Sequence, residues 1–418
     1  MTGFKMRCTR KSVMPSPRLS RPIAFLFLVL PSGISNGFSL VTLPFVLTKE
    51  GFPVALSASI MAIGIVSNVL RFLWGPVADF TLTLRRWYAG GVVASAASLL
   101  ILSHMPFRQE AAGMLTVVVF LSLVATTFIV LPVGGLMAHT VAEEEKGRAA
   151  GWYQAGNLGG TGLGGGLGVW LATHYSVGIA GVALAAAMIA CATALFLVPD
   201  VAPAADKRLS RKMLEMGHEF RELLRSPIAL LTLFLFASPI GVGALSSLWS
   251  ALSADWSVSP DVVALTSGLL SGFVSAAGCV AGGWMADRLG RWWAYFGSGV
   301  LIALVAIVMA LCPRTAGIYV AGVLCYAFSG GANNAAFSAL LLNAIGHGAA
   351  STKYATLASI GNLPSAYMVA LDGWVRDRFG VGMMLMVDAW SGVLCVLLGL
   401  IALQRIRRPS AIVAGRPT

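Results

Sequence analysis

Gly75-Pro-Val-Ala-Asp79 and Gly283-Trp-Met-Ala-Asp287 are two versions of one pattern, and they lie 208 residues apart in a chain of 418 residues. Each pentapeptide ends a long apolar stretch, and arginines follow each of them. The spacing is almost half the length of the chain. A duplicated bundle of membrane helices is the simplest source of such spacing, and internal repeats of this kind are typical of secondary transporters.

The composition identifies an integral membrane protein. Hydrophobic residues make up 57% of the chain and charged residues 11%, whereas soluble domains carry about 25% charged residues. A membrane-spanning helix needs about 20 apolar residues. Twelve such runs are predicted, at 22–47, 54–79, 87–105, 113–137, 150–173, 178–198, 227–252, 260–286, 292–312, 316–343, 354–375 and 381–403. A β-barrel is not expected, because its strands would be about ten residues long and alternating.

The twelve predicted helices fall into two halves of six, at 22–198 and 227–404. Between them, residues 199–226 form a polar interruption whose apolar positions recur at helical spacing, which predicts an amphipathic linker helix on the membrane surface. A second echo, Gly156-Asn-Leu158 and Gly361-Asn-Leu363, supports the duplication. Residues 1–21 and 405–418 are predicted to be terminal tails.

The distribution of positive charge predicts the orientation. If the N-terminus is inside, the inner segments hold 23 Lys and Arg residues and the outer segments hold 5. Positive residues resist translocation, so both termini are predicted to be cytoplasmic in a cytoplasmic (inner) membrane. The net charge of +12 therefore does not indicate nucleic-acid binding, since no basic run is interleaved with aromatics. A plain cytoplasmic tail is preferred for residues 1–21, with a transit peptide as the alternative.

The residues that usually mark a cofactor or an active site are missing from the sequence. The six cysteines are scattered and form no CxxC pair, and the five histidines lie at span ends or in loops. No HExxH or Walker-type motif is present. We expect no metal, no cofactor and no enzymatic activity. The predicted partners are a small-molecule substrate and the lipid bilayer, and a monomer is expected.

The repeated pentapeptide predicts a gate at the inner ends of the second and eighth helices. Its glycines, Gly75 and Gly283, let a neighbouring helix approach closely. Its aspartates, Asp79 and Asp287, lie one turn further on the same helix face. There they can accept hydrogen bonds from a neighbouring helix N-terminus or pair with arginine. The alternative, an ordinary charged helix end, accounts poorly for two matched copies.

These residues resemble the major facilitator superfamily. Its loop motif, Gly-x-x-x-Asp-Arg-x-Gly-Arg, is complete from Gly283 to Arg291 and includes Arg288, while Phe80 replaces the arginine in the first copy. Segments such as Tyr326–Gly331 and Arg71–Pro76 look like the group of AmpG-type muropeptide permeases, acetyl-CoA transporters and siderophore permeases. The resemblance implies the major facilitator fold, with gating by Gly75, Asp79, Gly283, Asp287, Arg288 and Arg291.

Arg71, Asp372 and Asp388 lie about one turn or more inside predicted spans, where charge is costly and usually functional. Arg71 is predicted to bind an anionic substrate or a carboxylate, with extension to the lipid headgroups as the alternative. Asp372 and Asp388 are candidates for a coupling proton, because a buried carboxyl group retains its proton more readily. An ion pair between Asp372 and Arg376 is the competing interpretation.

Uncharged polar residues within apolar spans predict a polar cavity. The resemblance implies that the first, fourth, seventh and tenth helices line it, and we name Asn36, Trp249, Asn333 and Asn334 as substrate-binding candidates. Interhelical hydrogen bonding is the alternative for such residues. On the fifth helix, Gly156, Gly160, Gly164 and Gly168 form a small-residue stripe that permits close helix approach.

The sequence therefore predicts a secondary active transporter that works by alternating access. An importer of a polar organic solute of the muropeptide, siderophore or acyl-CoA type, coupled to protons, is preferred. A drug or metabolite exporter of the same fold is the alternative, and an uncoupled facilitator also remains open. A membrane enzyme or sensor is disfavoured, because no reactive cluster or soluble output domain is visible.

Overall fold

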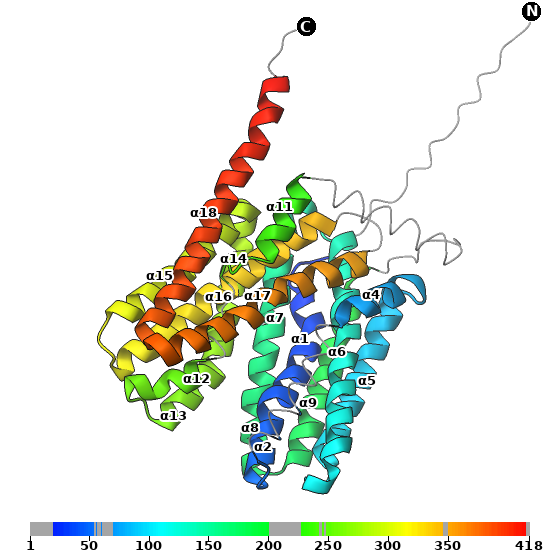
Figure 1. Ribbon diagram of the computed structural model, residues 1–418. Helices are drawn as coiled ribbons and strands as arrows, with labels where there is room; N and C mark the ends of the chain where they lie inside the picture. The colour runs from blue at the N-terminus through cyan, green and yellow to red at the C-terminus, as the bar shows by residue number, and fades with distance from the viewer. Residues whose placement is uncertain are drawn as a thin grey trace, which may run out of the picture.

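The computed structural model describes residues 20–53, 56, 60, 70–199, 227–241, 245, 248–345 and 350–414. The described residues form helices and short helical turns and contain no β-strand, which confirms the predicted all-α fold (Figure 1). The predicted amphipathic linker lies outside the described residues from residue 200 onward.

The N-terminal half consists of long helices that several helical turns interrupt. Its α-helices are α1 (Ala24–Gly37), α2 (Leu43–Lys49), α4 (Arg71–Phe80), α5 (Leu84–His104), α6 (Ala112–Thr140), α7 (Lys146–Gly162), α8 (Gly168–His174) and α9 (Val177–Ala192). π-Helical segments at Phe38–Thr42 and Leu163–Leu167 join α1 to α2 and α7 to α8. 3₁₀ turns lie at Gln109–Ala111, Glu143–Glu145 and Thr193–Leu197.

The C-terminal half begins with a broken helix. Its elements are α11 (Pro227–Phe236), α12 (Trp249–Leu252), a 3₁₀ turn (Ser253–Trp256), α13 (Pro260–Val263), a π-helical segment (Ala264–Leu270), α14 (Ser271–Arg288), α15 (Arg291–Leu311), α16 (Ala316–Ile345), α17 (Ala350–Phe379) and α18 (Val381–Ala414). The span predicted at 227–252 is not continuous, because α11 ends at Phe236. Pro239 follows without a backbone N–H, and Gly241 adopts a φ of +63°.

Local residue chemistry sets several helix ends. Thr83 Oγ1 accepts the backbone N–H of Arg86 at 3.3 Å, and Ser176 Oγ accepts that of Ile179 at 3.2 Å, so α5 and α9 begin at side-chain caps. Gly290 separates α14 from α15 with a φ of +93°, a left-handed conformation that glycine adopts without a steric penalty. Gly290 of the second motif copy therefore forms the turn between the two helices.

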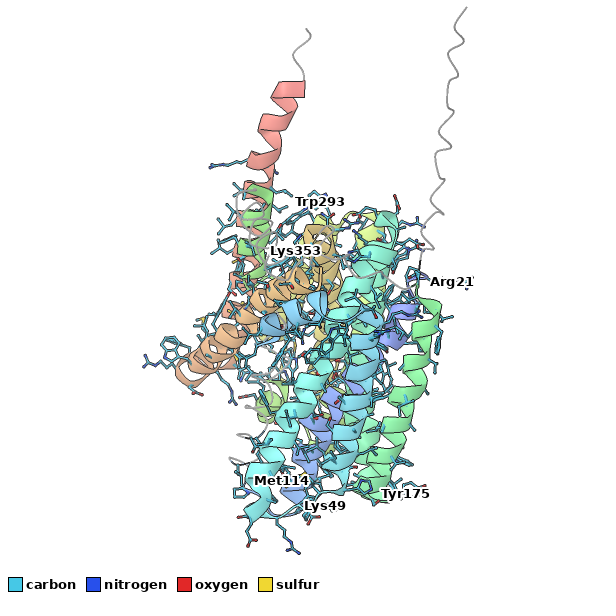
Figure 2. All side chains as sticks on the ribbon, turned by 90° about the vertical axis from the view of Figure 1, so that its right-hand side faces the viewer. Arg21, Lys49, Met114, Tyr175, Trp293 and Lys353 are labelled. Atoms are coloured by element: carbon cyan, nitrogen blue, oxygen red, sulfur yellow. The ribbon has the colours of Figure 1, made fainter. Side chains whose placement is uncertain are left out.

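The outer surface of the bundle is apolar, as expected for a protein in contact with lipid. Seven helical stretches among the described residues are long and apolar enough to cross a membrane. Large apolar side chains are exposed along them, including Val93, Met114 and Leu311. Arg21, Trp293 and Lys353 lie at one end of the bundle, and Lys49, Met114 and Tyr175 lie at the other (Figure 2).

The described residues form three main apolar cores, which divide the molecule unequally. The largest core joins both halves at the end near Lys353 and includes Tyr88 and Tyr153 together with Leu340 and Tyr354. A second core contains only residues from 34 to 188, and a third only residues from 245 to 389. The halves therefore share a core at one end, whereas toward the other end each packs on itself and the two diverge (Figure 1).

Candidate functional site

A cavity of about 600 Å³ lies between the two halves. Its walls come from α1, α4, α6 and α7 of the first half and from α11, α15, α16 and α17 of the second. The lining combines aromatic side chains with side chains that carry amides, hydroxyls and one guanidinium. The polar lining residues are Ser32, Asn36, Arg71, Gln154, Asn157, Ser238, Asn333, Asn334, Ser338, Asn362 and Ser365.

Four of the five predicted substrate-binding residues lie on this cavity: Asn36, Arg71, Asn333 and Asn334. The Asn36 Oδ1 atom is buried and accepts no hydrogen bond from the described residues. Asn333 is only 4% exposed, and its amide donates to Tyr295 O at 3.2 Å and to Ser298 Oγ at 3.0 Å. The Asn333 side chain therefore ties α16 to α15 in the cavity wall. Its neighbour Asn334 is exposed and available to a solute.

Trp249, the fifth predicted substrate contact, lies away from the cavity in the core of the C-terminal half. Its ring packs edge-on against Tyr326 and Tyr319, with centroid distances of 5.4 and 6.4 Å. Its carbonyl oxygen accepts the Tyr319 hydroxyl at 2.9 Å. The interruption after Phe236 shifts the helical register of this span, so counting along an unbroken helix misplaces the indole.

Arg71 is the only charged side chain among the described residues that line the cavity. It is half-buried at the first residue of α4. Its positive charge acts on the hydroxyl groups of Tyr153 and Tyr354, which come from opposite halves of the molecule. The guanidinium is thus positioned at the seam between the halves.

Four residues form what we call the floor layer of the cavity: Tyr153, Gln154, Ser338 and Tyr354. Gln154 Nε2 donates a hydrogen bond of 2.6 Å to Ser338 Oγ across the seam between α7 and α16. The rings of Tyr153 and Tyr354 meet edge to face at 6.1 Å across the seam between α7 and α17. Ser338, Tyr153 and Tyr354 are all buried. The floor layer therefore closes the cavity toward the end where the halves share a core.

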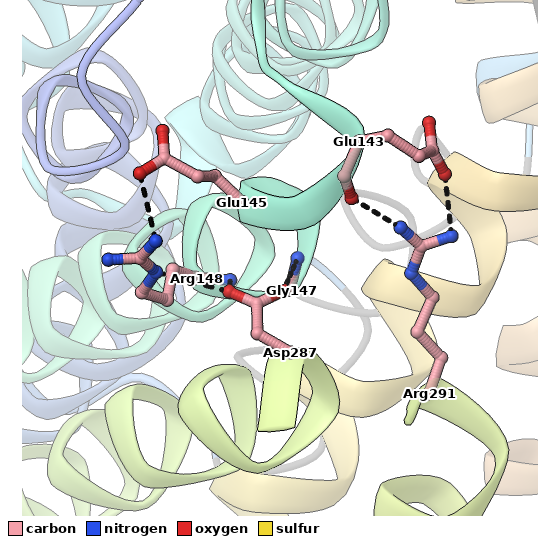
Figure 3. Close-up of polar contacts among 6 residues, drawn as sticks. All are labelled: Glu143, Glu145, Gly147, Arg148, Asp287 and Arg291. Atoms are coloured by element: carbon pink, nitrogen blue, oxygen red, sulfur yellow. Dashed lines mark hydrogen bonds and ion pairs between the residues drawn. The ribbon is translucent and has the colours of Figure 1, made fainter. Parts of the chain in front are cut away.

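Beyond the floor layer, α14 of the second half meets the start of α7 (Figure 3). The Asp287 carboxylate accepts the backbone N–H groups of Gly147 and Arg148 at 2.8 and 2.9 Å, and the Arg148 Nε–H at 3.2 Å. The first N–H groups of a helix lack intrahelical partners and carry partial positive charge. Asp287 therefore caps a helix of the opposite half.

A second polar group lies beside Asp287. Arg291 donates to the Glu143 side chain at 2.8 Å, to the Glu143 carbonyl at 2.6 Å and to Asn343 Oδ1 at 2.6 Å. Lys146 pairs with the same carboxylate at 2.6 Å. Partial burial raises the pKa of Glu143, but its hydrogen bonds to Lys146 and Arg291 and their charges outweigh this effect and lower the pKa below its ordinary value. We call Glu143, Asp287, Arg291 and the start of α7 the latch.

The latch contacts can form because glycines let α7 and α14 approach each other closely. A Cβ atom added at Gly283 would lie 2.6 Å from the carbonyl oxygen of Gly147, and one added at Gly151 would lie 2.7 Å from that of Cys279. The predicted stripe of Gly156, Gly160 and Gly164 faces α1 instead. α7 therefore uses one glycine face within its own half and another across the seam.

The other predicted gating residues take different positions. Arg288 is exposed and its guanidinium lies over its own helix neighbour Trp284, 5.6 Å from the ring centroid, so it does not join the latch. Gly75 of α4 approaches Thr352 at the start of α17, where an added Cβ would lie 2.7 Å from the Thr352 Cα. This contact mirrors that of Gly283. Asp79 belongs to the last turn of α4, and its side chain lies outside the described part of the structure.

The two predicted coupling residues lie in the C-terminal half, outside the cavity lining. Asp372 is completely buried, and neither carboxyl oxygen has a hydrogen-bond partner among the described residues. Asp388 Oδ2 accepts the Tyr326 hydroxyl at 3.3 Å and interacts electrostatically with Asp372. Arg376, the competing partner of Asp372, pairs with Asp255 at 3.3 Å.

Two helical halves with a cavity on their seam and a latch at one end define a membrane transporter of small solutes. The profile described as Major Facilitator Superfamily matches residues 25–369. The chain belongs to this superfamily, and it is a transporter, not an enzyme. No curated protein matches the chain by sequence.

Several solved transporters share the fold. The human organic anion transporter MFSD10 (TETRAN) is 17% identical, with a TM-score of 0.65 over 90% of this chain and 98% of its own. A bacterial homologue of the iron transporter ferroportin, in an outward-facing state with soaked iron, is 14% identical, with a TM-score of 0.64 over 93% and 99%. The proton:xylose symporter XylE, bound to 6-bromo-6-deoxy-D-glucose, is 12% identical, with a TM-score of 0.68 over 90% and 94%.

Proposed function

We propose that the chain is a proton-coupled importer of a polar organic solute in the cytoplasmic membrane, and that it works by alternating access. The observation that carries this proposal is the unequal division of the apolar cores, because the halves are joined at the latch and separate toward the other end. With both termini cytoplasmic, as the charge distribution predicts, the latch is on the cytoplasmic side. The cavity is then positioned to load from outside.

The cavity walls support a polar organic solute of drug-like size. A volume of about 600 Å³ lies within the range of about 300–1,000 Å³ that is usual for small-molecule sites. Amides and hydroxyls from both halves offer donors and acceptors, and aromatic walls offer apolar contact. Muropeptide, siderophore and acyl-CoA-like solutes are the substrates of the transporter groups that the sequence resembles. The organic anions and the xylose named for the structural relatives are also polar organic solutes.

The buried carboxyl groups support proton coupling. An ionised Asp372 would be a buried charge without a compensating hydrogen bond, which costs several kcal/mol, so the group favours a bound proton in this conformation. The polar groups that face it are Tyr326 from α16 and Asp388 from α18, while Arg376 of its own helix is engaged by Asp255. A proton that leaves when the halves move would link the gradient to the transport cycle.

An exporter of a drug or metabolite is the alternative, and an uncoupled facilitator is a further one. A thermal-shift screen of the purified protein over siderophores, cell-wall fragments and acyl-CoA compounds would supply a substrate. Uptake of the best ligand into proteoliposomes is then measured with an imposed pH gradient. We expect accumulation only when the outside is acidic. Accumulation that follows the opposite gradient would support an exporter, and uptake that stops at equal concentrations would support a facilitator.

A further inference from the structure

The floor layer is the point where the cavity lining and the inter-half contacts coincide. Gln154, Ser338 and Tyr354 line the cavity, and each also contacts the opposite half. The latch residues do not line this cavity, because they lie about 12 Å further along α7 at a rise of about 1.5 Å per residue. A solute can therefore reach the floor layer directly, whereas it cannot reach the latch.

The hydrogen bonds at the floor form a chain that begins in the cavity. Asn157 Nδ2 donates to Gln154 Oε1 at 3.5 Å, and Gln154 Nε2 donates to Ser338 Oγ at 2.6 Å. Asn157 and Gln154 belong to the first half and Ser338 to the second. The bond between Gln154 and Ser338 thus ties the halves together, and its donor is within reach of a bound solute.

Arg71 supplies the electrostatic preference at the same place. It is the only charged group among the described lining residues, and its charge acts on both floor tyrosines. Guanidinium groups bind carboxylate and phosphate oxygens with two parallel hydrogen bonds. An anionic oxygen next to Arg71 would also be a stronger acceptor for the Gln154 amide than the neutral Ser338 hydroxyl.

We propose that the floor layer is a solute-operated gate: an anionic oxygen of the solute binds Arg71 and takes the hydrogen bond that Gln154 donates to Ser338. Loss of that bond loosens the contact between α7 and α16 and lets the halves part at the floor. The substrate is then an organic anion with an apolar body that packs on Tyr153 and Tyr354. This inference rests on the proposed alternating-access transport and names its substrate class and its trigger.

The gate is tested without a known substrate by hydrogen–deuterium exchange of the full-length protein in lipid nanodiscs. Ser338→Ala should raise the exchange of residues 146–153 and 352–357 by about fivefold, the size expected for one lost hydrogen bond. Ser329→Ala is the matched control on the same helix, because Ser329 Oγ donates within its own helix to Cys325 O at 2.8 Å. If Ser338→Ala exchanges like the control, the gate proposal is wrong.

Asp287→Asn separates this failure from a failure of the proposed function, since it opens the latch without touching the floor. If Asp287→Asn raises exchange and Ser338→Ala does not, alternating access stands and the floor gate falls. If neither variant changes exchange, both ideas fall.

The anionic trigger is tested with matched pairs of carboxylates and neutral amides: benzoate and benzamide, lactate and lactamide, N-acetylglycine and N-acetylglycinamide. We expect at least one carboxylate, and not its amide, to raise exchange at the floor of the unmodified protein, and Arg71→Gln to abolish the response. Equal responses to acid and amide, a response that survives Arg71→Gln, or no response to any carboxylate would overturn the anionic trigger.

Discussion

Asp287 connects the halves through both backbone and side-chain donors, and its effect depends on its charge. Its carboxylate is largely buried and caps a helix that belongs to the other half. Hydrogen bonds to a charged group contribute about 1.5–3 kcal/mol each, more than neutral ones. Asp287→Asn keeps the size of the side chain and removes the charge. We expect it to destabilise the closed latch by about 2 kcal/mol and to increase solvent exchange at the start of α7.

Two further variants serve as controls for Asp287→Asn. Arg288→Gln should leave hydrogen–deuterium exchange at the start of α7 unchanged, because Arg288 is exposed and its guanidinium stacks on Trp284 of its own helix. Asp79→Asn should impair transport less than Asp287→Asn, because the first motif copy has lost part of its charged loop. A larger effect of Asp79→Asn would contradict the view that the second copy carries the main latch.

Glu143 gives the latch a dependence on pH. Lys146 and Arg291 hold the pKa of Glu143 below its ordinary value of about 4.5. A carboxylate with a lowered pKa stabilises the latched state above the ordinary pKa, and this stabilisation is lost as the pH falls through the lowered value. We expect exchange at residues 143–148 to rise more steeply below about pH 4.5 in the unmodified protein than in Glu143→Gln. Parallel profiles would show that Glu143 is not the titrating group.

At the scale of the element, the seam between α7 and α14 depends on the absence of side chains. Gly283→Ala would place a methyl group against the backbone of α7, which cannot move aside as a flexible side chain can. We expect a lower thermal midpoint and a shift away from the latched conformation. Gly297→Ala on α15 is the matched control, because no atom lies within 4 Å of its added Cβ. Equal melting of the two variants would contradict the close-contact account.

The sequence predicts elements better than it predicts contacts between them. The apolar runs give nearly all the described spans, because a helix in lipid must satisfy its own backbone hydrogen bonds. The apolar run at 227–252 does not reveal the break after Phe236, although Pro239 and Gly241 mark it, and an unbroken helix there would not place Trp249 in the core where the structure has it. The sequence does not single out Gln154, because a helix alone does not reveal which of its faces meets α16. Its spacing of three from Asn157, in a glycine-rich helix, was the available signal.

At the scale of the whole molecule, apolar packing holds the two halves together at one end of the described structure and not at the other. The shared core at the latch must divide before the cavity can open on that side, and new contacts between the halves must form at the opposite end. The polar latch and floor layer contribute specificity to a contact that burial already favours. A solute or proton that weakens these polar contacts needs to shift the balance by only a few kcal/mol.

Asp372 lies outside the lining of the cavity. In the proposed proton coupling, its protonation would therefore affect the solute through the packing of the C-terminal half and not by direct contact. Asp372→Asn resembles the protonated carboxylic acid in size and lack of charge. We expect the variant to transport solute down its own gradient and to lose both accumulation and the accompanying proton uptake in proteoliposomes with an acidic outside. Asp377→Asn is the matched control on the same helix, because Asp377 is exposed. If Asp372→Asn accumulates solute as the control does, the coupling proton binds elsewhere.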